Sequence, residues 1–238
     1  MYKTTLAVVL RTENYRENDR MLTLFTQDSG RVEALARGCR KQGSKLSAFA
    51  EPFVCAEVQL YEKNNRTTVT QAVIKESFYS LREDIGAFSC ASLLVSACEK
   101  CIVPESPERK LFALLVNCLY ALVNKADPMD TAVFFSLRLL FVLGQGISLS
   151  ECASCGKKEV SSIDFENGCV LCGSCPGGVS FGSDFISILR LMQSSGVKSI
   201  SENVYGVGEK EAVLFVEHAL SAAQIGVPKQ LSFMMKKI

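Results

Sequence analysis

Tryptophan is absent from this sequence of 238 residues, and histidine occurs only once. Without tryptophan, any stacking of nucleic-acid bases on aromatic rings would depend on phenylalanine and tyrosine. The single histidine, His218, falls in a segment with helical character, so histidine-based catalysis is not expected. A glycine-rich phosphate loop, a G-x-S-x-G elbow and paired catalytic carboxylates are also missing. The sequence therefore predicts a protein that is not an enzyme and has no small-molecule substrate.

Long apolar runs and a large excess of either charge are missing as well. The most apolar stretch, residues 132–143, is too short to cross a bilayer and contains Arg138. The N-terminus lacks a basic segment followed by an apolar core, so we expect a cytoplasmic protein with no membrane association. The formal net charge is only +1, and binding to nucleic acid would therefore need a local cationic patch.

The first third of the sequence has the pattern of β-strands. Five short segments rich in Val, Leu and Thr are separated by turn signals, and they span residues 4–12, 21–26, 31–37, 53–62 and 66–75. Gly30 suits a tight turn before the third segment, and Asn64-Asn65 suits a hairpin between the last two. Because a closed barrel removes exposed strand edges, this pattern predicts a five-stranded barrel of the oligonucleotide-binding (OB) type over residues 1–80.

After about residue 78 the apolar period changes from 2 to 3.6. Ser106-Pro107 and Asp127-Pro128 each combine an N-cap residue with a proline in the first turn, and apolar helical stripes follow both. Further helices are expected at residues 84–101, 184–194 and 208–223. Residues 81–238 therefore predict a helical domain with an insert at about residues 150–178. The fold class that we expect is α+β, a β-barrel followed by a helical bundle.

The insert contains most of the chemistry that the cysteines suggest. Eleven cysteines in a cytoplasmic chain indicate reduced thiols or metal ligands rather than disulfides. Two C-x-x-C pairs with 16 residues between them, a spacing typical of zinc sites, consist of Cys152, Cys155, Cys172 and Cys175. Four thiolates leave no position for water, so one structural Zn²⁺ per chain is expected. The alternatives are unconnected thiols or a redox pair, although no thioredoxin-like pattern surrounds them.

Cys169 leaves the second pair open, because Cys169 and Cys172 have the same spacing as Cys172 and Cys175. We favour Cys172 and Cys175, since residues 169–171 are typical of a short strand that leads into the turn. A third C-x-x-C motif, Cys98 and Cys101, lies in a helical pattern without a partner pair. We interpret it as two thiols of the helical core.

A basic segment follows the third expected strand. Its four cations are Arg37, Arg40, Lys41 and Lys45, with two glycines and no acid among them. A mobile basic loop on a barrel can follow a phosphate backbone without reading bases, which favours DNA binding. The alternative is an ordinary solvated loop. Arg11 and Arg20 would extend the cationic patch, although acids lie near both in the sequence.

Several of these motifs resemble the RecO family of bacterial recombination mediators. Residues 15–20 are similar to a YxExDR stretch of that family, and residues 22–41 to its LTLFT…G…AKGARK core. Cys152-x-x-Cys155-Gly156 resembles the entry to the family's zinc module. The resemblance is strong up to about residue 84 and at the cysteines, and it is loose over the helices.

The resemblance implies a mediator of DNA repair in the RecF pathway that binds single- and double-stranded DNA and anneals strands. It also implies work with RecR, contact with the C-terminal tail of single-stranded DNA-binding protein (SSB), help in loading RecA, and a nucleoid-associated location. The phosphate contacts would come from Arg37, Arg40, Lys41 and Lys45, and the zinc ligands would be Cys152, Cys155, Cys172 and Cys175. The alternative is a protein-interaction scaffold with a structural zinc that does not bind DNA.

Overall fold

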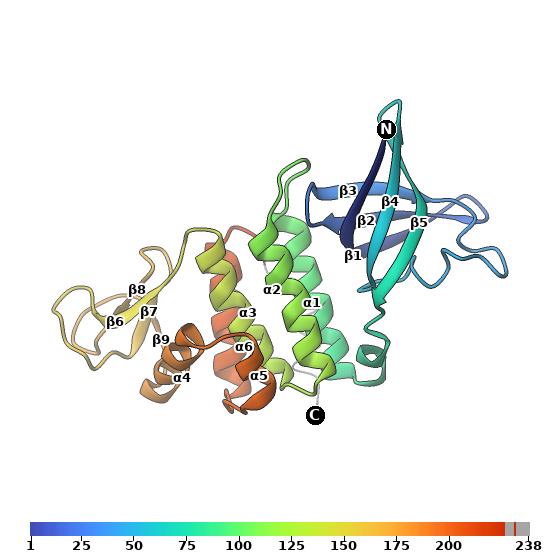
Figure 1. The fold of residues 1–238 in the computed structure, drawn as a ribbon. Coiled ribbons are helices and arrows are strands. Elements are labelled where there is room, and N and C mark those ends of the chain that lie inside the picture. Colours follow the sequence, from blue (N-terminus) through green and yellow to red (C-terminus); the bar gives the residue numbers. More distant parts are fainter. Residues whose placement is uncertain (227–230, 232–238) are drawn as a thin grey trace. The chain divides into compact units, whose positions relative to one another are not determined.

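The computed structural model describes residues 1–226 and residue 231 (Figure 1). The chain divides into two compact units, Met1–Glu83 with Cys98–Val116, and Asp84–Ala97 with Asn117–Ile238. We call the first the barrel unit and the second the helical unit. Helices α1 (Ile85–Cys101) and α2 (Arg109–Val123) contribute residues to both. The domain boundary at residue 80 stays a prediction.

The N-terminal strands form a closed barrel. They are β1 (Tyr2–Tyr15), β2 (Asp19–Thr26), β3 (Gly30–Ala36), β4 (Cys55–Lys63) and β5 (Arg66–Glu76). Their order is β1-β2-β3-β5-β4, with antiparallel pairing except for the short parallel contact between β3 and β5. Alternate side chains such as Leu22, Leu24 and Val58 fill the interior. The predicted α+β fold with an N-terminal five-stranded barrel is confirmed.

Two turns of the barrel follow directly from the sequence. Asn64 and Asn65 join β4 to β5, and both have left-handed backbone angles, with φ of 50° and 56°. Asn tolerates this conformation, which matches the twist of a hairpin. Gly30, the first residue of β3, has φ of 62°, and a Cβ atom there would lie 2.3 Å from the carbonyl oxygen of Val103. Only glycine therefore fits at this close backbone approach.

The helical unit contains the remaining helices and a small sheet. The helices are α3 (Pro128–Val142), α4 (Ser183–Ser194), α5 (Lys198–Glu202) and α6 (Glu209–Ala222). The sheet strands are β6 (Ser148–Cys152), β7 (Ser162–Asp164), β8 (Cys169–Leu171) and β9 (Val179–Ser180), in the order β6-β8-β7-β9. A short 3-10 helix, Tyr79–Glu83, follows the barrel strands. Within residues 1–226, no helix is long and apolar enough to span a bilayer.

The structure confirms one of the two predicted helix starts, and the other helix begins later than predicted. Asp127 caps α3 as predicted, because its carboxylate accepts hydrogen bonds from the backbone N–H groups of Met129 and Asp130. Helix α2 instead begins at Arg109, so Pro107 precedes the helix rather than lying in its first turn. Both prolines lie outside the helix interior, where a residue must donate a backbone N–H that proline lacks.

Two charged side chains of α3 are anchored within the helical unit. The carboxylate of Asp130 is only 1% exposed and accepts hydrogen bonds from the backbone N–H groups of Tyr205 at 2.8 Å and Val207 at 3.0 Å. Losing it would leave buried donors unsatisfied, at a cost of about 1–3 kcal/mol for each. Arg138 donates to the carbonyl oxygens of Met192 and Ser195, where α4 ends. It therefore serves as a cation at a helix C-terminus, not as the partner of an acid.

Candidate metal centre and nucleic-acid interface

Four cysteine sulfurs meet in the small sheet of the helical unit. The Sγ atoms of Cys152, Cys155, Cys172 and Cys175 all lie within 4.8 Å of one another. Parallel pairing of β6 with β8 places Cys152 opposite Val170, so the end of β6 and the turn after β8 are neighbours. The Sγ atoms of Cys155 and Cys172 are 3.6 Å apart. These four residues could hold one metal ion.

Hydrogen bonds in the two C-x-x-C turns position the cysteines and favour the thiolate form of Cys152. Within each C-x-x-C turn a backbone N–H donates to the first cysteine's carbonyl, from Gly156 to Cys152 at 2.8 Å and from Cys175 to Cys172 at 3.1 Å. Hydrogen bonding from the backbone of Cys172 is the main cause that lowers the pKa of Cys152 to about 6. A thiol with that pKa is largely a thiolate at neutral pH, the form that binds metals. In the same cluster, side-chain hydrogen bonds to Cys172 and Cys152 raise the pKa of Cys155 to about 12, so a metal ion would displace a proton there. Four sulfur donors suit a tetrahedral ion.

Cys169 lies outside this group of sulfurs. It begins β8, where it pairs with Asp164 of β7 and Ser148 of β6, and burial raises the pKa of its thiol. The segment 169–171 is a strand that leads into the turn, as the sequence suggests. The geometry therefore supports the Cys172 and Cys175 pairing, although the ligand set remains a proposal. Cys98 and Cys101 lie in α1, the first buried and the second half-buried.

Exchanging single sulfurs for oxygens distinguishes the two pairings. Cys175→Ser is expected to lose most of the bound metal, because only three of the four clustered thiolates remain. Cys169→Ser is expected to retain about one metal ion per chain. Elemental analysis of both purified variants beside the parent protein makes the measurement. The reverse result, with metal lost only from Cys169→Ser, would show that our pairing is wrong, and metal-free parent protein would favour the redox interpretation.

The basic segment forms the loop between β3 and β4. Its cations Arg37, Arg40, Lys41 and Lys45 are all exposed. We call them the basic loop. Successive turns shape it, with Lys41 N–H donating to Gly38 at 3.1 Å and Ser44 N–H to Lys41 at 3.1 Å. The N–H of Arg40 also donates to the carbonyl of Asn18, in the turn before β2, at 3.0 Å. Backbone contacts thus shape a loop that we had expected to be mobile.

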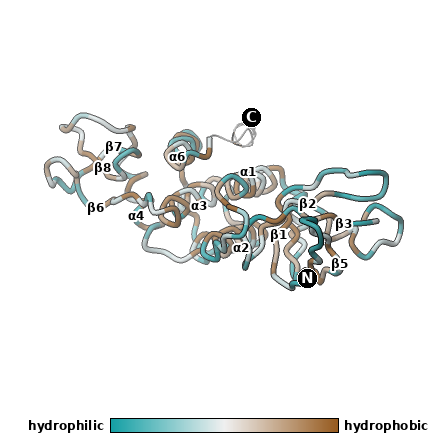
Figure 2. The backbone as a smooth tube through the Cα atoms, turned by 90° about the horizontal axis from the view of Figure 1, so that it is seen from above, coloured by the Kyte–Doolittle hydropathy of each residue, from teal (hydrophilic) through white to brown (hydrophobic). Residues whose placement is uncertain are grey.

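The loops around the basic loop are polar. Figure 2 shows the loops that extend beyond β2 and β3 as largely hydrophilic. Phe49 and Ala50, farther along the β3–β4 connection, are fully buried in the barrel core. This connection is therefore anchored by apolar side chains at one point while its cations remain in solvent. Such an arrangement holds charges near a ligand with less ordering cost than a free chain would have.

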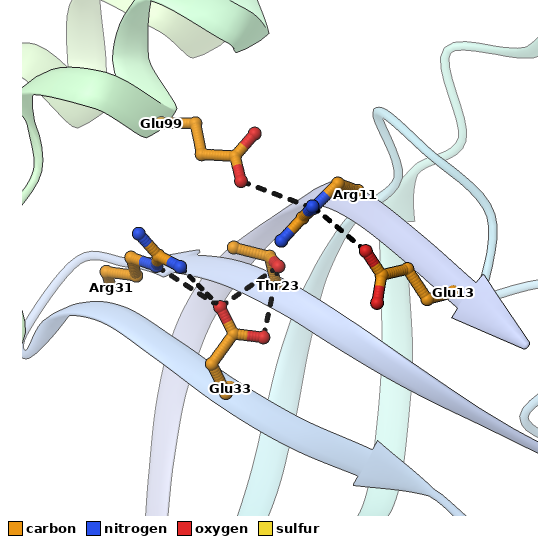
Figure 3. Close-up of polar contacts among 6 residues, drawn as sticks. All are labelled: Arg11, Glu13, Thr23, Arg31, Glu33 and Glu99. Carbon is orange, nitrogen blue, oxygen red and sulfur yellow. Dashed lines mark hydrogen bonds and ion pairs between the residues drawn. The ribbon is translucent and has the colours of Figure 1, made fainter. Parts of the chain in front are cut away.

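Arg11 and Arg20 do not extend the patch. Arg11 forms ion pairs with Glu13 at 2.9 Å and with Glu99 at 3.3 Å (Figure 3). Arg20 donates to Glu51 at 2.6 Å and to the carbonyl of Ala50 at 2.7 Å. Both charges are paired with acids inside the barrel unit, so neither arginine is included in the proposed cationic surface.

A groove beside the basic loop adds cations that sequence reasoning missed. It has a volume of about 920 Å³, which lies in the range of small-ligand sites. Arg37 lies on its lining together with Lys63 and Arg66, the residues that flank the β4–β5 turn. Tyr61 contributes an aromatic ring. The described residues that line the groove include no acid. We call this feature the basic groove.

The groove could not be predicted from the sequence, because its cations lie far apart along the chain. Arg37 follows β3 while Lys63 and Arg66 belong to the β4–β5 hairpin, and only the parallel contact of β3 with β5 brings them together. The only signal for the groove in the sequence was that Lys63 and Arg66 flank the predicted hairpin turn at Asn64-Asn65. Leu46, next to Lys45 in the chain, also lines the groove, so the basic loop continues into it.

Comparison with known proteins gives matches along most of the chain. Residues 1–78 match the family model described as "Recombination protein O N terminal", and residues 82–206 match "Recombination protein O C terminal". A protein named "DNA repair protein RecO" from Clostridium novyi is 29% identical over 224 residues, with 85% of each chain covered. One of the same name from Alkaliphilus metalliredigens is 33% identical over 180 residues, which cover 74% of this chain and 73% of the relative.

Proposed function

Because the chain belongs to the RecO family of DNA repair proteins, we propose that it binds DNA through the basic groove and the basic loop. The proposal rests on one observation. Cations from two segments that are distant in the sequence line the same groove, and the described residues of its lining include no acid. DNA phosphates release condensed counterions when lysines and arginines neutralise them, which drives binding that is independent of sequence. Contacts limited to phosphates leave the base edges available for pairing with another strand.

The activity that suits such a surface is that of a recombination mediator. We propose that the protein binds both single- and double-stranded DNA and anneals complementary strands. It would act with RecR and the C-terminal tail of SSB to load RecA, in the cytoplasm at the nucleoid. Family membership supports DNA repair in general, and these finer roles rest on the family likeness. None of the proposed contacts makes or breaks a covalent bond, so the role is not enzymatic.

We further propose that Zn²⁺ is the ion at the four clustered cysteines, one per chain. Four thiolates that can surround one ion tetrahedrally favour Zn²⁺ over the hard cations Mg²⁺ and Ca²⁺, which prefer oxygen ligands. When bound, the ion cross-links the two C-x-x-C turns. With Cys152, Cys155, Cys172 and Cys175 as ligands, no coordination position stays open for water, so the site is structural.

Binding to poly-dT on protein of known metal content tests the proposed function. Affinity is expected to fall about 300-fold between about 50 mM and about 200 mM salt if all six cations contact phosphates, given a slope near 0.7 for each contact on single strands. Filter binding at the two salt concentrations measures this. A metal-loaded protein that ignores poly-dT even at the lower concentration would refute the proposal and favour the protein-interaction scaffold.

A further inference from the structure

Two helices of the helical unit end at one cavity. Helix α3 ends at Val142 and α6 at Ala222, and the two helices pack side by side (Figure 1). Gly144 and Gln224, just beyond these ends, line the same cavity of about 680 Å³. Each helix C-terminus carries roughly half a negative charge from its last carbonyl groups. The cavity therefore receives two negative helix ends at once.

Backbone N–H groups cap both helix ends, with Gln145 donating to the carbonyl of Leu140 in α3 and Ile225 to that of Leu220 in α6. What the described residues do not supply at these ends is a cationic side chain. Neither α3 nor α6 has a basic residue in its last turn. The described residues that line the cavity include the acid Glu166 and no lysine or arginine. Helix α4 of the same unit is different, because Arg138 donates to carbonyl groups at its C-terminal end. The fold thus supplies an arginine at one helix end and none at the paired ends of α3 and α6.

The other wall of the cavity is aromatic and well supported. The rings of Phe165 and His218 stack with centroids 5.4 Å apart and an interplanar angle of 21°. Phe165 also contacts Phe215, with ring centroids 5.6 Å apart, and Phe181 at 6.2 Å. These contacts pack the aromatic wall against α6 and against the segment just before α4. Aromatic rings in such a wall attract cations through their electron-rich faces.

The β7–β8 turn fixes the backbone at Glu166, whose side chain is exposed. The carboxylate of Asp164 accepts hydrogen bonds from the backbone N–H groups of Glu166 at 3.1 Å and Asn167 at 3.0 Å. A Cβ atom on Gly168 would lie 3.1 Å from the carbonyl oxygen of Gly146, so this turn packs closely against the segment after α3. The cavity is therefore formed by the fold itself before any ligand binds.

We propose that this cavity binds an arginine side chain of a partner protein. The negative helix ends and Glu166 favour a cation, and a space of about 680 Å³ far exceeds a bare metal ion. A guanidinium is planar, carries five N–H donors for carbonyl and carboxylate oxygens, and stacks on aromatic rings. The proposed DNA interface belongs to the barrel unit, so this site does not depend on it.

Small model compounds test the site on the full, metal-loaded protein. N-acetyl-arginine amide is the probe, and N-acetyl-citrulline amide has nearly the same shape without the charge. We expect saturable NMR shifts at the backbone amides of Gly144 and Gly168 and on the His218 ring with the arginine compound. The citrulline compound should give shifts at least fivefold smaller at equal concentration, since it lacks the charge that the cavity attracts.

Two variants of cavity residues and one control variant make the result specific. Glu166→Lys should abolish the shifts, whereas Glu202→Lys, an exposed charge reversal in α5 outside the cavity, should retain them. Ser221→Arg places a cation in the last turn of α6 and should block the probe while raising the midpoint of thermal unfolding. Equal shifts with both compounds, or shifts that survive Glu166→Lys and Ser221→Arg, would overturn the proposal. A response to CaCl₂ with none to the arginine compound would also overturn it.

Discussion

If the clustered cysteines bind the proposed metal ion, its removal with a strong chelator is expected to unfold the cysteine module, residues 148–180, while the barrel stays folded. The module has strands of only two to five residues, and few of its side chains are fully buried, Ile163 and Val170 among them. Such a core cannot offset the conformational entropy of about thirty ordered residues. Zinc binding contributes on the order of 10–16 kcal/mol in isolated zinc-finger peptides, which is enough to hold a module of this size together.

Hydrogen exchange measured by mass spectrometry, with and without chelator, makes the comparison. Amides of the module should lose protection, and so should those at the C-terminal end of α4, because Arg190 bonds the carbonyls of Leu149 and Ser150. Barrel amides should keep theirs, because the barrel core contains none of the clustered cysteines. Cys172→Ser should reproduce the effect without chelator, and Cys101→Ser serves as the matched control. Unchanged protection of the module in metal-free protein would contradict a structural role for the ion.

Neutralising the cations of the barrel unit is expected to weaken DNA binding by about 100-fold at about 0.1 M salt for a triple substitution, with the salt slope reduced by about 2. One variant changes Arg40, Lys41 and Lys45 to Ala in the basic loop. The other changes Arg37, Lys63 and Arg66 to Ala in the basic groove. All six side chains lie on the surface, so their removal leaves the barrel core intact.

A double variant of ion-paired arginines, Arg11→Gln with Arg31→Gln, is the matched control. Arg11 is held by Glu13 and Glu99, and Arg31 by Glu33 at 3.0 Å, so their contribution to phosphate binding should be small (Figure 3). Fluorescence anisotropy with labelled oligo-dT at several salt concentrations gives both the affinity and the slope. A groove variant with full affinity would restrict the interface to the basic loop. If both triple variants kept the parental slope, neither surface would contact phosphates.

Local patterns in the sequence determined the elements and the chemistry of the cysteines. Strand segments were visible because one face of each is buried, which imposes a period of 2 on the side chains. Asn64-Asn65 marked its hairpin, and Asp127-Pro128 marked the start of α3, since turn and cap geometry depend on neighbouring residues. The spacing of the two C-x-x-C pairs indicated a four-thiolate site. Each of these signals acts within a few residues of chain.

Only the tertiary structure decided which charges are available and which are compensated. Barrel closure brought Arg37 beside the β4–β5 hairpin, and packing against Glu99 removed Arg11 from the cationic surface. The buried bonds of Asp130 and the common cavity at the ends of α3 and α6 likewise join segments far apart in sequence. Electrostatic interactions depend on distance in space, which a linear pattern does not contain. The sequence by itself therefore determined the barrel, the main helices and the C-x-x-C pairs. Folding alone placed Cys175 rather than Cys169 among the four clustered sulfurs and determined where charge is left for a partner.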